Sequence, residues 1–194
     1  MAARVVTLAF QGVEAVRVEV EVQLTSGEAA FIIVGLGDKA VTESRERVRA
    51  AFAGLGLAWP GRRIIANLAP ADLPKVGSHY DLPIALAVMA AMGVIPPDAL
   101  EGWAAMGELS LDGRIAAVAG ALPAAMAAGS LDLGLICPEP CGAEAAWAGE
   151  TRSRTRHDPG RSSSRPTPDH GQPRTWWPWP IGGGSCRPGL AQGC

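Results

Sequence analysis

Long hydrophobic runs are missing from this sequence of 194 residues. The longest apolar stretch extends from Leu82 to Ile95 and contains Pro83, and its 14 residues fall short of the roughly 18 that a membrane-spanning helix needs. The first residues alternate apolar and polar side chains, so they lack the continuous apolar segment of a secretory signal. We therefore expect a cytoplasmic protein that makes no contact with a membrane.

Metal-binding and nucleotide-binding patterns are missing as well. None of the four cysteines forms a C-x-x-C pair, and no histidine or second pair lies at zinc-ligand spacing from the two that are closest, Cys137 and Cys141. The loop G-x-x-x-x-G-K-[ST], whose backbone cradles nucleotide phosphates, is absent. We expect no metal site, no bound cofactor and no ATP hydrolysis by this chain alone.

The residues that are present divide the chain near position 150. Residues 1–150 contain 10 Lys and Arg against 17 Asp and Glu, a net charge of −7. Residues 151–194 contain seven Arg, seven Pro and two Asp, but no Val, Phe or Met. Because this second part has too little aliphatic surface to offset its ordering entropy, we expect a folded domain over 1–150 and a disordered tail over 151–194.

Two interpretations of the tail stay open. It could be a nucleic-acid-binding arm, since arginine neutralises phosphate and the indoles of Trp176, Trp177 and Trp179 could stack on bases. Its bias towards Arg, Pro, Gly, Ser and Trp is also typical of a GC-rich coding region translated out of frame. We favour the second interpretation.

Hydrophobic periodicity predicts alternating strands and helices over the domain. Residues 16–24 alternate valine or leucine with polar side chains, the pattern of a strand with one buried face. A helix with one apolar stripe should begin near Thr42. The other predicted elements are strands over 31–34, 63–68 and 133–137, helices over 82–92 and 121–129, and a hairpin at Asp112-Gly113. The fold class is therefore α/β (α+β).

Local signals mark the ends of some of these elements. The continuously apolar run 31–34 is typical of a strand that is covered on both faces. Gly54 or Gly56 can end the first helix. Asp81 is well placed to cap the buried helix over 82–92, which has Pro83 in its first turn.

Three stretches carry a resemblance to a known family. They read VGLGDKAVTESRERVRAAF from Val34, NLAPADLPKVGSHYDLPIALAVM from Asn67 and GELSLDGRIAAVAGALPAAMAA from Gly107. Over about residues 4–149 the chain resembles the N-terminal domain of magnesium-chelatase-like AAA+ proteins of the ComM/YifB type. The resemblance implies a Lon-protease-like βαβ domain with a mixed sheet and packed helices.

The resemblance also implies a partner set and an activity for the longer proteins of the family. Those proteins form hexameric rings on DNA and use ATP and Mg²⁺, bound by a following AAA+ module, to drive branch migration in natural transformation and recombination. This chain departs from the pattern, because it lacks the phosphate-binding loop and continues into the uncharacteristic tail. It therefore resembles a family member truncated before the ATPase module.

A Lon-like fold raises the possibility of a Ser/Lys protease, in which lysine activates a serine nucleophile. Alignment of Pro74 to Gly77 with the start of the protease motif places His79 at the nucleophile position, with Ser78 one residue away. Alignment of the second motif places Leu122 where the protease has its lysine. We expect no proteolysis and name no catalytic residue.

The polar residues of the loop that precedes the helix over 82–92 have simpler interpretations than catalysis. Ser78, His79 and Asp81 look like a triad, but three neighbours in sequence rarely converge on one point. His79 is more simply a loop residue, and Lys75 is either a phosphate contact or an exposed, solvated lysine. The family-motif loop as a whole comprises Pro74, Lys75, Gly77, Tyr80 and Asp81.

The domain also has one cluster of basic residues. The residues that could contact DNA or a neighbouring subunit are Arg45, Arg49, Arg62, Arg63 and, in the motif loop, Lys75. The alternative is a solvated helix face on which Glu43 pairs with Arg47 and Glu46 with Arg49. A net charge of −7 favours this alternative.

Two classes of function remain open from the sequence. The domain could be an accessory module of a DNA-translocating ATPase, helping ring assembly or DNA engagement. It could instead be a standalone interaction module, or a remnant without function. A role in inserting magnesium into a porphyrin is suggested by the family name but by no residue, and no small-molecule substrate is evident.

Overall fold

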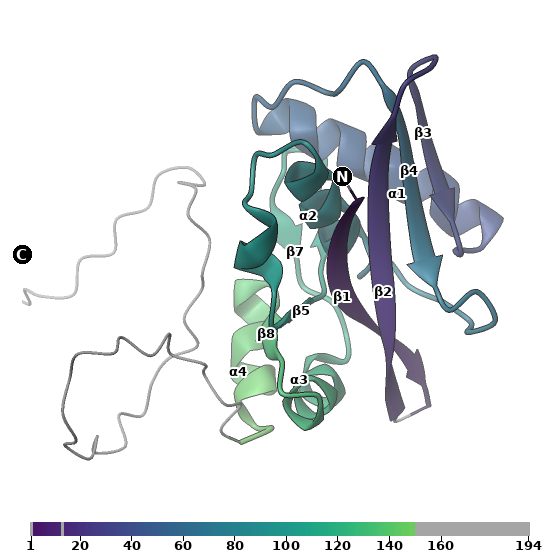
Figure 1. Cartoon of the computed structure of the whole chain (residues 1–194). Helices are drawn as coiled ribbons and strands as arrows, with labels where there is room; N and C mark the ends of the chain where they lie inside the picture. Colours follow the sequence, from purple (N-terminus) through teal and green to yellow (C-terminus); the bar gives the residue numbers. More distant parts are fainter. Residues whose placement is uncertain (1, 13, 150–194) are drawn as a thin grey trace, which may run out of the picture.

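A six-stranded mixed sheet forms the frame of the domain in the computed structural model, which describes residues 2–12 and 14–149 (Figure 1). The strand order is β3-β4-β2-β1-β5-β8. Strands β1, β2 and β4 run antiparallel to their neighbours within this trio, while the pairs β3–β4, β1–β5 and β5–β8 are parallel. The strands are β1 (Ala2–Gln11), β2 (Glu14–Thr25), β3 (Ala30–Val34), β4 (Arg63–Ala69), β5 (Trp103–Ala105) and β8 (Gly134–Ile136).

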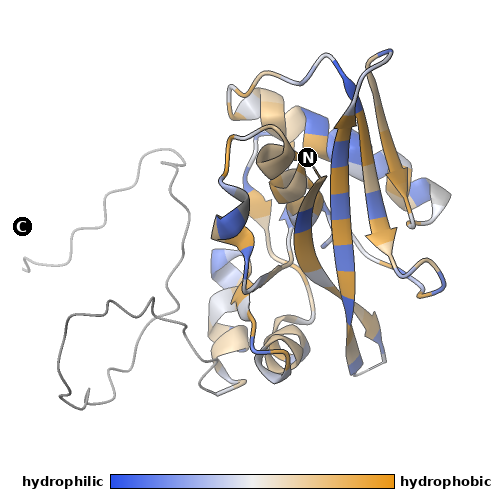
Figure 2. Cartoon of the chain, viewed as in Figure 1, coloured by the Kyte–Doolittle hydropathy of each residue, from blue (hydrophilic) through white to orange (hydrophobic). Residues whose placement is uncertain are grey.

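The long strand β2 shows how the sequence pattern becomes a buried face. Val18, Val20 and Val22 are completely buried, while the polar residues between them face outward, which appears as alternating orange and blue bands in Figure 2. The strand pairs with β1 over ten positions, with Val5 opposite Val20. The strand predicted over 16–24 is therefore confirmed, and its hairpin partner β1 was not predicted.

Helices cover the apolar face of this sheet. They are α1 (Asp38–Gly54), α2 (Asp81–Ala91), α3 (Ala121–Ser130) and α4 (Gly142–Ala146), with short 3-10 turns η1 (Pro97–Leu100) and η2 (Glu139–Cys141). Helix α2 is the centre of the core, because every residue from Asp81 to Ala90 is buried. The predicted helices over 82–92 and 121–129 and the mixed α/β fold class are confirmed.

Glycines end the first helix and turn the small hairpin, as the sequence indicated. Gly56 has a φ of +69°, and the Leu57 N–H donates to the Phe52 carbonyl at 2.9 Å, which closes a Schellman turn after α1. Strands β6 (Glu108–Leu109) and β7 (Ile115–Ala116) form the predicted hairpin, and Gly113 has a φ of +86° in its turn.

Several expectations need correction. Helix α1 begins at Asp38, four residues earlier than predicted. Strand β3 lies at an edge of the sheet and buries only alternate residues, so it is not covered on both faces. Strand β5 and helix α4 were not predicted, because three-residue and five-residue elements are too short to show a period.

The predicted tail, residues 151–194, lies outside the described residues. Within residues 2–12 and 14–149, no helix is both long enough and apolar enough to cross a membrane.

Candidate functional site: the motif loop and the arginine patch

The motif loop, residues 70–80, connects the end of β4 to the start of α2. Strands β3 and β4 are parallel, with Val34 opposite Asn67, so the loop that follows β3 and the motif loop leave the sheet at the same edge. The first loop leads into α1. The two helices therefore start beside each other, and their facing side chains can interact.

Lys75 holds the motif loop together from inside. Its ammonium donates to the carbonyl oxygens of Pro70 and Leu73, the second at 3.1 Å, and its side chain is buried. Burial lowers the pKa of Lys75 from its ordinary value. The expectation of an exposed lysine is wrong, and the side chain is committed to the loop's own backbone. Val76 beside it is 80% exposed at the tip.

Asp81 forms the main link between the motif loop and α1. Its carboxylate, only 1% exposed, accepts from Arg47 Nε at 2.5 Å and from Arg47 Nη2 at 3.3 Å. The backbone N–H of Leu109 in β6 also donates to it, at 3.3 Å. The hydrogen bond to Asp81 raises the pKa of Arg47, and burial partly opposes this effect. This bidentate ion pair joins α1 to α2, and the hydrogen bond from Leu109 joins both to the β6–β7 hairpin.

The prediction that Asp81 caps α2 is wrong. The residue before the helix is Tyr80, which makes no side-chain capping hydrogen bond, and Asp81 is the first helical residue. A carboxylate in the first turn still interacts favourably with the helix dipole. Its oxygens, however, accept hydrogen bonds from Arg47 of α1 and from the backbone of β6.

The triad-like residues have three different partners. Ser78 Oγ donates to Glu108 Oε2, and His79 Nε2 donates to the Leu8 carbonyl at 2.9 Å. His79 is buried against the ring of Tyr80, and this burial lowers its pKa, so the ring is neutral at pH 7. As expected from their closeness in sequence, these side chains do not converge with Asp81 on one point.

Tyr80 is packed in the core instead of pointing into a site. It is 1% exposed, burial raises its pKa, and its hydroxyl has no hydrogen-bond partner among the described residues. Pro74 and Gly77 are exposed. Gly77 has a φ of +108°, and a Cβ atom there would lie 2.9 Å from Nδ1 of His79. The motif loop is therefore a rigid connector more than an open binding site.

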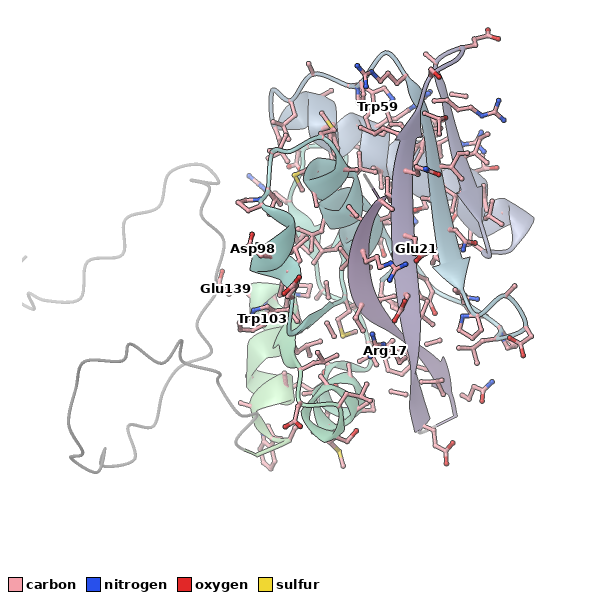
Figure 3. All side chains as sticks on the ribbon, in the orientation of Figure 1. Arg17, Glu21, Trp59, Asp98, Trp103 and Glu139 are labelled. Atoms are coloured by element: carbon pink, nitrogen blue, oxygen red, sulfur yellow. The ribbon has the colours of Figure 1, made fainter. Side chains whose placement is uncertain are left out.

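The second candidate site is the arginine patch, which we define as Arg45 and Arg49 of α1 together with Arg62 and Arg63 at and just before the start of β4. The guanidinium of Arg49 lies 5.6 Å from the centre of the Trp59 ring. Trp59 in turn packs against Phe31 of β3 and Phe52 of α1, with ring centres 5.1 and 5.0 Å apart. Figure 3 labels Trp59 near the top of the view. Arg49 is thus linked through Trp59 to β3, and Arg63 is the first residue of the neighbouring strand β4.

No arginine of the patch forms an ion pair with a residue in the described part of the chain. The predicted pair between Glu43 and Arg47 is present at 3.6 Å, whereas the predicted pair between Glu46 and Arg49 does not form. The half-buried Arg45 leaves its Nε without a hydrogen-bond partner there. Most other cations are paired, in Arg4–Glu21, Arg17–Glu19, Lys39–Glu43 and Arg114–Asp112.

The two cysteines of the domain, Cys137 and Cys141, are not part of a cluster of metal-ligand side chains among the described residues. Residues 2–12 and 14–149 hold no group of three or more His, Cys, Asp and Glu side chains that could bind a metal ion. Cys141 Sγ instead interacts with the backbone of Val118, and burial raises the pKa of Cys137 to about 11.

Known proteins resemble this chain over the same region. The model of the family "Subunit ChlI of Mg-chelatase" matches residues 20–140. An uncharacterized protein of Mycobacterium tuberculosis is 46% identical over 125 residues, which are 64% of this chain and 25% of that protein. The competence protein ComM of Haemophilus influenzae is 42% identical over 120 residues, 62% of this chain and 24% of ComM.

A fuller overlap comes from the uncharacterized protein YifB of Salmonella typhimurium. It is 39% identical over 147 residues, which cover 70% of this chain and 29% of YifB. The chain thus spans about a quarter of the length of the curated relatives it matches. Because the family model matches well over half of the chain, the chain belongs to the family of the ChlI subunit of Mg-chelatase.

Proposed function

We propose that residues 1–150 are an accessory N-terminal module of an ATP-dependent DNA branch-migration helicase of the ComM/YifB type. The 42% identity to a competence protein is the observation that carries this proposal. Competence is the uptake of DNA, so the relative's name connects this domain to DNA handling. A Lon-protease-like fold, a cytoplasmic location and a hexameric ring are further parts of the proposal, taken from the resemblance.

The module would not supply the chemistry itself. The sequence lacks the phosphate-binding loop G-x-x-x-x-G-K-[ST], so ATP hydrolysis would belong to another segment. Proteolysis is equally unsupported, because Ser78 hydrogen-bonds to Glu108 and the ammonium of Lys75 donates to the backbone oxygens of Pro70 and Leu73. What the module offers is a rigid α/β body with one set of unpaired arginines, which suits contact with DNA phosphates or with an acidic neighbour.

The alternative is a standalone interaction module without an ATPase. The gene distinguishes the two, because the proposal requires ATPase-coding sequence downstream. Sequencing the DNA beyond codon 150 and reading all three forward frames should reveal G-x-x-x-x-G-K-[ST] in a continuous frame. A stretch without that motif in any frame would support the standalone alternative.

A further inference from the structure

Strand β3 has one side without a partner strand. In the described part of the chain it pairs with β4 alone and ends the sheet. Such a strand presents unpaired backbone N–H and C=O groups, which proteins usually protect with a charged side chain or a proline. The sequence of β3, AFIIV, contains neither. We call this free side of Ala30–Val34 the β3 edge.

The outward-facing side chains of β3 form an apolar surface. The inward-facing residues of the strand are buried, so Ala30, Ile32 and Val34 share the opposite face, and Val34 is 47% exposed. Ile65 of β4 lies opposite Ile32 and enlarges this surface. Figure 1 shows α1 and α2 behind β4 and β3 and no helix in front of them. A strand added at the β3 edge would continue this apolar face.

The arginine patch borders the start of the β3 edge. Trp59 packs on Phe31 of β3, and Arg49 lies over the Trp59 ring. Arg63 is paired opposite Ala30, the first residue of β3. The arginines of the patch form no ion pair with a described residue, so they are available to a carboxylate from outside.

The charge of the domain is positive at this end, although its net charge is negative. Residues 30–63, which comprise β3, α1 and the first residue of β4, contain six Lys and Arg against three Asp and Glu. The rest of residues 1–150 contains four against 14. Because physiological salt screens exposed charges beyond about 8 Å, a group that binds at the β3 edge experiences mainly the local positive charge.

We propose that the β3 edge binds an extended segment of another protein in which apolar and acidic side chains alternate. The segment adds a strand to the sheet, with its backbone hydrogen-bonded to β3. Its apolar side chains continue the row of Ile32 and Val34 on the open face, and its carboxylates on the helix side meet Arg49. DNA fits less well, because a sugar-phosphate backbone cannot continue a β-ladder and leaves the apolar face uncovered.

This inference goes beyond the proposed function and can fail separately from it, since the binding is measured without DNA or an ATPase. The probe is a short fluorescent peptide in which valine alternates with glutamate, and its anisotropy is measured with the whole 194-residue chain. We expect saturable binding that weakens as salt is raised. A peptide with lysine in place of glutamate should bind at least about tenfold more weakly.

Methylation of the peptide's backbone nitrogens tests the addition of a strand. The N–H groups of a β-strand point alternately to its two sides, so only every second one can donate to β3. Methylation of one alternate set should reduce the affinity about tenfold, whereas methylation of the other set should change it little. Both peptides are tested with the unaltered chain, so the result does not depend on the folding of a variant.

Charge reversal tests the arginine patch. The variant R49E/R62E should bind the valine–glutamate peptide about tenfold more weakly, because it places like charges opposite one another. The control R4E/R114E changes the charge by the same amount, in β1 and in the β6–β7 hairpin, and should bind like the unaltered chain. Circular dichroism verifies that each variant is folded.

Three results would overturn the proposal. One is equal affinity of the two methylated peptides, which would show that the peptide does not extend the sheet. Another is an equal loss of affinity in R49E/R62E and R4E/R114E, which would show that the peptide responds only to the net charge. The third is unchanged peptide binding by R49E/R62E together with weaker binding to a DNA duplex, which would assign the patch to DNA.

Discussion

Replacement of Arg47 by leucine is expected to reduce the free energy of unfolding by about 3 kcal/mol, as measured by urea denaturation. The variant leaves the carboxylate of Asp81, 1% exposed, with only the N–H of Leu109 as a partner. A buried carboxylate without its cation is costly, because desolvation is no longer offset by the ion pair. We expect this loss of the ion pair to destabilise the motif loop as well, because the loop ends at Tyr80, directly before Asp81.

Matched variants separate the ion pair from a general effect of losing an arginine. Arg49→Leu removes an arginine from the same helix that has no acidic partner among the described residues, and it should change stability by less than about 1 kcal/mol. The double variant R47L/D81L should regain part of the loss, since it no longer contains an unpaired buried charge. A loss for Arg47→Leu no larger than for Arg49→Leu would show that the pair does not stabilise the fold.

Replacement of Gly35 by alanine should destabilise the domain by more than about 3 kcal/mol. Gly35 follows β3 with a φ of +95°, and a Cβ atom there would lie 2.4 Å from the backbone oxygen of Leu68 in β4. The backbone cannot move aside without breaking the parallel β3–β4 pairing. Thermal and urea unfolding measure this loss.

Gly56 provides a control with the same kind of backbone but no close contact. Its φ is +69°, and a Cβ atom would meet nothing within 4 Å. Gly56→Ala should therefore cost only the conformational penalty of about 1 kcal/mol. Equal losses for the two variants would mean that the approach of Gly35 to Leu68 does not constrain the loop before α1.

Local patterns were sufficient to predict most of the fold. The alternation of Val18, Val20 and Val22 identifies a strand with one buried face, and the continuously apolar α2 identifies a buried helix, because each pattern depends only on neighbours in sequence. Asp112-Gly113 predicted its hairpin for the same reason. Strand β1 was not predicted, and in the structure it buries three consecutive residues, 7–9.

The contacts of the candidate site could not be predicted in this way. Arg47 and Asp81 are 34 residues apart, and only the packing of α1 beside α2 brings them together. The sequence suggested a cap for Asp81 and an exposed Lys75, because both are the common outcomes for those residue types. The arginine patch was recognised as a basic cluster, but its lack of acidic partners depends on which rotamers and neighbours the fold provides.

The most direct test of the account is a chimera with a longer relative. The segment of Haemophilus influenzae ComM that aligns with this chain would be replaced by residues 4–149, and transformation frequency would be measured. We expect the chimera to retain transformation, to lose it with R45S/R49S/R62S/R63S, and to keep it with the charge-matched R4S/R17S/K39S/R114S. A stably expressed chimera as inactive as a deletion of the segment, or equal activity of the two fourfold variants, would contradict the account.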